Sequence, residues 1–143
     1  MRYSRTWTGL SLGLLAGVQL AFGCGDDDGG TAADRVGIAA ECASDEQCPQ
    51  ARRGDQTIAL QCIREFRGGY CGIADCQGNE DCPDGSRCVS HDDGTNYCFR
   101  DCTQKVECNR NRTPENEANC SSNIDFVEAA QSIKACVPPS SGT

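Results

Sequence analysis

The sequence is poor in the residues on which several protein classes depend. Its 143 residues include one histidine, one tryptophan and one methionine, and aromatic side chains make up 6% of the chain. A single histidine excludes most histidine-based catalysis and His-rich metal sites. The net charge of −8 argues against a nucleic-acid partner, because nucleic-acid binding rests on basic patches. No apolar run is long enough for a protein that crosses a membrane several times.

Cysteine, by contrast, is abundant. Thirteen residues are cysteine, which places the chain at the edge of the disulfide-scaffold class among short secreted proteins. An odd number leaves one thiol without an intramolecular partner. One cysteine therefore needs a role other than a disulfide within the chain.

The N-terminus has the features of an export signal. Arg2 and Arg5 form a short basic region, and residues 10–22 are apolar apart from Ser11, Gln19 and glycines. An apolar run of this length suits a signal peptide and is too short to cross a bilayer. We therefore expect a signal peptide at 1–23.

The end of this signal, Leu20-Ala21-Phe22-Gly23-Cys24, resembles the lipobox of bacterial lipoproteins. In that family the cysteine after a small residue is lipidated and becomes the new N-terminus. The resemblance implies a lipid anchor, including palmitate, on Cys24, and the glycine at position 25 implies sorting to the outer membrane or the cell surface. Cleavage before Cys24 leaves 120 residues, with an even set of twelve cysteines besides the anchor.

Residues 24–40 are expected to comprise the lipidated cysteine and a flexible acidic tether. Asp26, Asp27 and Asp28 lie among glycines and small residues, without the spacing of a calcium-binding loop. The signal contains two arginines and no acidic residue, so its removal takes the net charge from −8 to −10. With no basic patch, the lipid has to provide all of the membrane attachment.

The other twelve cysteines form an internal repeat of three four-cysteine modules. In each module an acidic residue precedes the first cysteine, and five residues separate the first cysteine from the second. The members are Cys42, Cys48, Cys62 and Cys71; Cys76, Cys82, Cys88 and Cys98; and Cys102, Cys108, Cys120 and Cys136. The module boundaries are predicted at 41–74, 75–100 and 101–138, with a tail at 139–143.

We expect these twelve cysteines to be oxidised, and we expect no metal or other cofactor. An exported chain meets an oxidising compartment, and no module contains the Cys-x₂₋₄-Cys knuckle of a structural zinc site. Modules this small fall below the size, ~40 residues, at which an apolar core usually suffices alone. Four cysteines allow three pairings. First-with-third and second-with-fourth is the favoured one, and the sequence leaves all three open.

The predicted fold is small and disulfide-rich, with short β-hairpins, little regular structure and a short C-terminal helix. In the second module, strands at 87–91 and 95–99 flank a two-residue turn, Asp93-Gly94. The first module has the same outline over 62–70. In the third module, Ser122 and its neighbours are typical of a helix start, and the apolar spacing predicts a helix to about Ala135.

The cysteine pattern also resembles the Dickkopf N-terminal-like cysteine-rich repeats of predicted bacterial lipoproteins, notably of the myxobacterial type. The segment from Asp75-Cys76 to Cys98 carries the resemblance, with Glu41-Cys42 and Asp101-Cys102 as weaker copies. The first module departs from the pattern by an insertion at 50–61. The resemblance implies a disulfide-held extracellular module, and no activity comes with it.

No constellation of residues points to an enzyme. Ser90, His91 and Asp92 adjoin, but neighbours on a strand point to opposite faces and cannot form the hydrogen-bond chain of a triad. Arg53-Gly54-Asp55 matches a cell-adhesion tripeptide, but tripeptides occur by chance and a bacterial lipoprotein has no obvious integrin partner.

The expected protein is an exported bacterial lipoprotein of the cell envelope that displays a binding or structural module. The candidate ligand-binding loops are 50–61, 90–97 and 109–119, with an unknown protein or glycan as partner. The alternative is a small inhibitor of a secreted hydrolase, which predicts a protease-resistant loop and stoichiometric inhibition. The sequence leaves the ligand itself open.

Overall fold

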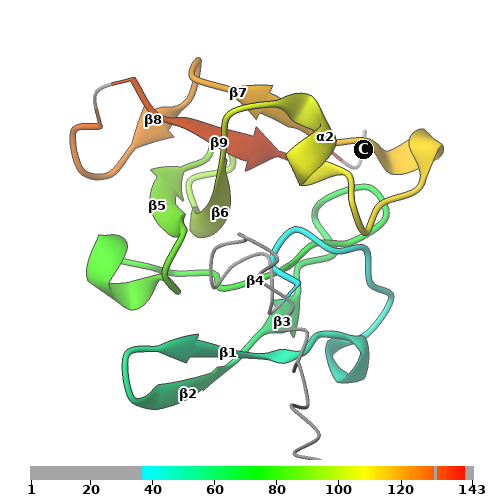
Figure 1. Cartoon of the computed structure of the whole chain (residues 1–143), viewed down its shortest axis with the longest axis horizontal. Coiled ribbons are helices and arrows are strands. Elements are labelled where there is room, and N and C mark those ends of the chain that lie inside the picture. Colours follow the sequence, from blue (N-terminus) through cyan, green and yellow to red (C-terminus); the bar gives the residue numbers. More distant parts are fainter. Residues whose placement is uncertain (1–36, 131, 141–143) are drawn as a thin grey trace, which may run out of the picture.

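The structure is a computed structural model that describes residues 37–130 and 132–140 (Figure 1). The predicted signal peptide, Cys24, the acidic tether up to residue 36 and the tail from 141 lie outside the described residues. The elements, in chain order, are η1 (Asp45–Gln47), β1 (Gln50–Arg53), β2 (Gln56–Ala59), β3 (Gln61–Cys62), β4 (Cys71–Gly72), η2 (Asn79–Asp81), β5 (Ser86–Ser90), β6 (Asn96–Cys102), α2 (Lys105–Cys108), η3 (Pro114–Asn116), β7 (Asn119–Ser121), β8 (Asp125–Phe126) and β9 (Lys134–Val137). No helix in these two ranges is long and apolar enough to cross a membrane.

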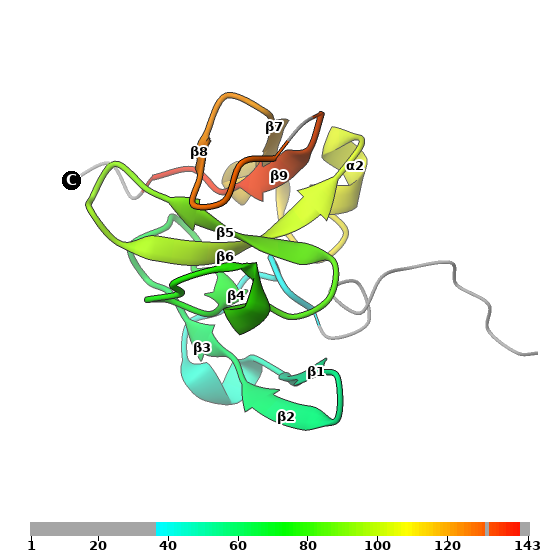
Figure 2. The ribbon, with the colours of Figure 1, turned by 90° about the vertical axis from the view of Figure 1, so that its left-hand side faces the viewer.

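In the described part of the chain, the strands form three antiparallel sheets. β1–β2 and β3–β4 are separate two-stranded hairpins, and the third sheet has five strands in the order β7-β9-β6-β5-β8. The longest strand, β6, lies at its centre and pairs with β5 on one side and β9 on the other (Figure 2). A single sheet therefore joins the second cysteine module to the third. The predicted class, a small disulfide-rich fold with short hairpins, is confirmed.

Six disulfides hold the chain, and each of them lies within one module. The bridges are Cys42–Cys62 and Cys48–Cys71, Cys76–Cys88 and Cys82–Cys98, and Cys102–Cys120 and Cys108–Cys136. The distances between their Cα atoms run from 5.3 to 5.9 Å, within the usual range for disulfides. First pairs with third and second with fourth in all three modules, the arrangement that the sequence favoured.

Each Cys-x₅-Cys segment folds into the same turn. A single helical turn begins three residues after the first cysteine, as η1, η2 and α2. The side chain just before the second cysteine accepts a hydrogen bond of 2.6 to 2.8 Å from the backbone N–H just after the first; these acceptors are Gln47, Asp81 and Glu107. The recurring spacing of five residues therefore corresponds to a closed, hydrogen-bonded loop that brings the two cysteines to one side.

The hairpin predicted in the second module is present as β5 and β6, but its loop is one residue longer than predicted. The His91 N–H donates to the Thr95 carbonyl, and the Gly94 N–H donates to the His91 carbonyl. Gly94 has a φ of +85°. This is the three-residue loop in which a type I turn is followed by a left-handed glycine.

The hairpin outline predicted in the first module corresponds to β3 and β4, each of two residues. Its turn passes through Gly68 and Gly69, which both have positive φ. A Cβ on Gly69 would lie 2.0 Å from the Cys42 carbonyl oxygen, so only glycine fits at this position. The short hairpin thus has few backbone hydrogen bonds between its strands, and its turn packs closely against the first cysteine of the module.

The helix predicted from Ser122 to about Ala135 is wrong. Residues 125–126 form β8, and residues 134–137 form β9 between β7 and β6. Ile124 and Phe126 are half-buried and alternate with the exposed Asp125 and Val127, which is the period of a strand. The buried Cys136 is bridged to Cys108, and this long-range bond holds β9 in the sheet.

The hydrophobic core is shared between modules. The ring of Phe66, from the first module, is 2% exposed. Its centroid lies 5.1 to 5.9 Å from those of Tyr70, His91, Tyr97 and Phe99. The last three belong to the second module. The sequence indicated modules held mainly by their own bridges, whereas the structure packs them around one aromatic cluster.

The folded part begins earlier than the predicted module boundary at residue 41. Ile38 and Ala39 are 1% and 2% exposed, and the Ala39 N–H donates to the Cys71 carbonyl. The predicted tether to residue 40 therefore includes residues that belong to the core. At the other end, the Arg67 N–H donates to the Pro139 carbonyl, so part of the predicted tail also packs.

Two tyrosines in the aromatic cluster should resist ionisation. Burial, and for Tyr97 also its hydrogen bond to Asp93, raises the pKa of Tyr97 to about 12 and that of Tyr70 further. An unfolded tyrosine titrates near pH 10. The raised pKa values therefore predict that the two tyrosines contribute fully to the free energy of unfolding below about pH 10. This contribution is lost as the pH rises through about 12. The chain without residues 1–23 has only these two tyrosines. Its tyrosinate absorbance should therefore not rise near pH 10, and a full rise at that pH would contradict the burial of the two rings.

Candidate functional site

The three loops expected to bind a ligand differ in how the fold uses them. Loop 109–119 holds the third module against the first. Arg112, 9% exposed, donates hydrogen bonds from its guanidinium to four backbone carbonyls, at 2.6 to 3.1 Å. The acceptors are Ala39, Arg67, Gly69 and Asn116. This loop is a structural clamp.

Glu41 reinforces the same contact from the first module. Its carboxylate accepts hydrogen bonds from the N–H and the hydroxyl of Thr113, at 3.1 and 2.9 Å. Partial burial acts to raise the pKa of Glu41, but hydrogen bonds from Asn116 and Thr113 and the charge of Arg112 together hold it below its usual value. Glu41 is therefore ionised at neutral pH and supports the clamp there.

Loop 90–97 is also tied to the body of the protein. The His91 ring packs edge-on against Phe66, with 5.2 Å between centroids. Asp93 accepts hydrogen bonds from the Thr95 N–H at 2.8 Å and the Tyr97 hydroxyl at 2.9 Å. These bonds outweigh the opposing effect of burial and lower the pKa of the Asp93 carboxyl. The ends of the loop are therefore tied to the fold, while its turn residues, 92–94, are exposed.

The three triad residue types of this loop are not arranged for nucleophilic catalysis. His91 Nδ1 lies 3.1 Å from Asp93 Oδ2. Ser90 and His91 both line a cleft of about 610 Å³ beside β8. Among the described residues, no serine forms a hydrogen bond to His91. A serine nucleophile needs that bond to transfer its proton.

The cysteine sulfurs form three compact clusters. Within each cluster the Sγ atoms lie within 4.8 Å of one another, and the members are Cys42, Cys48 and Cys62; Cys76, Cys82 and Cys88; and Cys102, Cys108 and Cys120. Zinc and similar metals bind thiolates. Every one of these sulfurs is part of a disulfide. In the oxidised chain these sulfurs therefore cross-link the fold.

The third candidate loop, 50–61, forms the hairpin β1–β2, which the sequence analysis missed. Arg53 pairs with Gln56 across a two-residue turn of Gly54 and Asp55. Gly54 has a φ of +56°, while Asp55 is not among the residues with positive φ, as in a type II′ turn. A Gly-Asp pair between two possible strands is a known hairpin signal. The predicted insertion at 50–61 therefore contained a hairpin signal that the prediction did not use.

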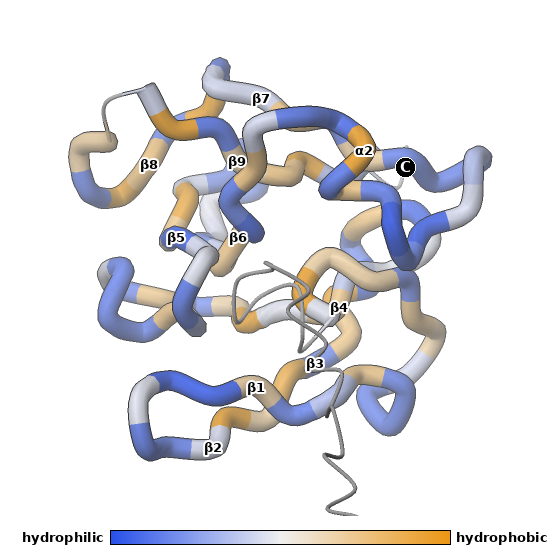
Figure 3. The backbone as a smooth tube through the Cα atoms, in the orientation of Figure 1, coloured by the Kyte–Doolittle hydropathy of each residue, from blue (hydrophilic) through white to orange (hydrophobic). Residues whose placement is uncertain are grey.

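The hairpin is anchored at its base and open at its tip. Ala51 and Leu60 are 0% and 4% exposed, whereas residues 54–57 are all exposed. Figures 1 and 2 both show β1 and β2 at the end of the molecule away from the five-stranded sheet. The colouring in Figure 3 shows that the residues around the turn are mostly hydrophilic. The hairpin β1–β2 therefore has a buried base and an exposed, hydrophilic tip.

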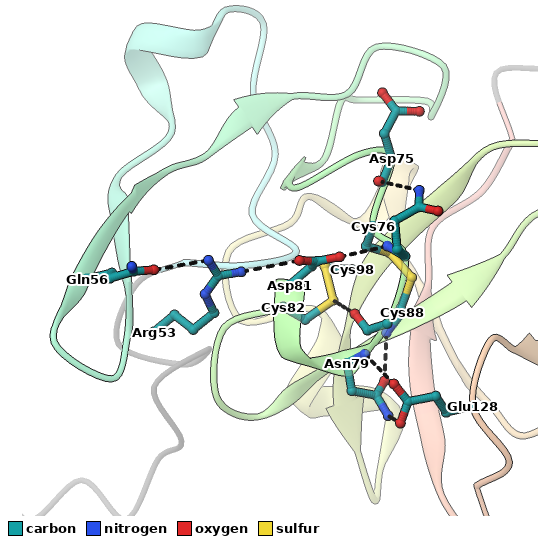
Figure 4. Close-up of polar contacts among 12 residues, drawn as sticks. Arg53, Gln56, Asp75, Cys76, Asn79, Asp81, Cys82, Cys88, Cys98 and Glu128 are labelled. Carbon is teal, nitrogen blue, oxygen red and sulfur yellow. Dashed lines mark hydrogen bonds and ion pairs between the residues drawn. A yellow bond between two sulfur atoms is a disulfide. The ribbon is translucent and has the colours of Figure 1, made fainter.

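The tip of the hairpin carries one positive and one negative side chain, Arg53 and Asp55. The Arg53 guanidinium donates to Gln56 Oε1 at 3.1 Å and lies 3.7 Å from Asp81 Oδ1, as Figure 4 shows. Asp81 belongs to η2 of the second module, where its other oxygen accepts from the Gln77 N–H at 2.8 Å. Within the described residues, the Asp55 carboxylate has no hydrogen bond or ion pair. A cation and a carboxylate therefore flank one exposed glycine.

No protein-family model, curated protein or solved structure matches the chain.

Proposed function

We propose that this chain is an exported bacterial lipoprotein that is anchored through Cys24 and presents the hairpin β1–β2 to a protein or glycan. One observation carries the proposal: the side chains of Asp93 and Arg112 tie loops 90–97 and 109–119 to the rest of the protein, whereas the tip of 50–61 is exposed and, within the described ranges, its Asp55 carboxylate has no hydrogen bond or ion pair. A disulfide-held scaffold with an exposed hairpin suits recognition, because little ordering entropy is lost when the hairpin binds.

The scaffold is suited to life outside the cytoplasm. Six disulfides are consistent with an exported protein, since such bonds persist in oxidising compartments. The acidic run at 26–28 supports a solvated spacer between a lipid and the folded modules. The alternative, an inhibitor of a secreted hydrolase, stays a prediction.

Cys24→Ser is expected to release the protein from the membrane. Each buried CH₂ of an acyl chain contributes about 0.8 kcal/mol to anchoring, and no basic patch substitutes for the lipid. The measurement is the distribution of the protein between membrane and soluble fractions, with palmitate labelling of the wild type. Ala33→Ser, which leaves every cysteine in place, is the control and should stay in the membrane. Retention of the Cys24 variant would reject the lipid anchor.

A further inference from the structure

The exposed tip contains the tripeptide Arg53-Gly54-Asp55, to which the sequence alone gave no meaning. Its position in the fold changes that assessment. Gly54 and Asp55 are the two turn residues, and an added Cβ on Gly54 would meet no atom within 4 Å. A partner can therefore approach the glycine closely and reach the side chains on both sides of it.

We propose that this tip binds an adhesion receptor of the integrin type, on a cell other than the bacterium itself, whose site combines a divalent cation with an acidic pocket. The Asp55 carboxylate would complete the coordination of the cation, since hard divalent cations prefer carboxylate oxygens. The Arg53 guanidinium would enter the acidic pocket, where it forms charge-assisted hydrogen bonds. Both contacts are made across the unobstructed glycine.

The two side chains are available at little cost. Asp55 has no intramolecular partner to give up among the described residues. Arg53 gives up an exposed hydrogen bond to Gln56 and an ion pair with Asp81 in which the two side chains are 35% and 39% exposed. Exposed pairs of this kind contribute little to stability. A receptor carboxylate can therefore replace Asp81 without disturbing the fold.

The charge of the chain also favours contact through a cation. The chain is acidic overall, because 21 acidic residues outnumber 13 basic ones, and its net charge of −8 becomes −10 without residues 1–23. A negatively charged protein repels an anionic receptor surface over long distances, whereas a metal ion held between two sets of carboxylates is attracted to both. Binding should therefore be lost when a chelator removes the cation.

The inference rests on the display proposed above, and its test does not depend on the anchor. The oxidised full chain, purified in detergent, is immobilised and probed with a purified Arg-Gly-Asp-binding integrin ectodomain in Mg²⁺ or in EDTA. We expect saturable binding in Mg²⁺ only. Asp55→Glu keeps the charge but moves the carboxylate, and should weaken binding at least about 30-fold, as for an interface hot spot.

Two further variants make the result specific to the tripeptide. Gly54→Asp combined with Asp55→Gly keeps composition, charge and a favoured Asp-Gly hairpin turn but scrambles the motif, and should also abolish binding. Asp84→Glu alters an exposed aspartate beside another glycine and should bind normally. Absence of wild-type binding, or equal binding by the scrambled chain, would overturn the inference. Membrane release by Cys24→Ser would still support the lipid anchor.

Discussion

Replacing Phe66 with alanine is expected to lower the free energy of unfolding by about 4 kcal/mol, within the range for a buried phenylalanine. The ring is 2% exposed and touches aromatic side chains of two modules. Edge-to-face contacts of this kind add to the loss of buried area. Guanidinium unfolding of the oxidised chain, followed by circular dichroism, measures the effect.

Phe126→Ala is the matched control for this change. Phe126 lies on the edge strand β8 and is half-buried, so the same truncation should cost much less. The Phe66 variant should also increase amide exchange in β6, in the second module, because Phe99 and Tyr97 lose a packing partner. A loss confined to the first module, with β6 unchanged, would show that the modules are independent after all.

The features predicted well from sequence are the local ones. The Cys-x₅-Cys repeat indicates closed loops of fixed size, and the structure forms them with hydrogen bonds that span four residues. The hairpins around Gly94 and Gly68 follow from turn residues that tolerate positive φ. In each case the deciding interaction lies within a few residues, so spacing and residue type carry the information.

The features missed depend on contacts between distant residues. Residues 122–135 have helical apolar spacing, but Cys136 is bridged to Cys108 and draws the chain into a sheet. No sequence pattern around Phe66 indicates its contacts with Tyr97 and Phe99, because these residues lie 31 and 33 positions later in the chain. The tip of β1–β2 is a different case, since its Gly-Asp turn signal was present and only its exposure required the structure.

Arg112 is the clearest residue whose role no local pattern reveals. In sequence it is one of two arginines in a polar loop. In the structure it is buried and joins residues 39, 67 and 69 of the chain to its own loop through their carbonyl oxygens. Burial lowers the pKa of the Arg112 guanidinium, and the charge of Glu41 opposes that effect. A rigid fork with several donors suits this site better than a lysine does.

Arg112→Met is therefore expected to lower the free energy of unfolding by about 4 kcal/mol, because a buried acceptor left without a partner costs about 1–3 kcal/mol. Methionine fills a similar volume, so the loss reports mainly the four hydrogen bonds. Arg112→Lys should recover only part of it. Arg52→Met, on the exposed face of β1, is the control and should change stability little. Denaturant unfolding measures all three variants. A loss below about 1 kcal/mol in Arg112→Met would mean that water replaces the guanidinium and that loop 109–119 is free to bind a ligand.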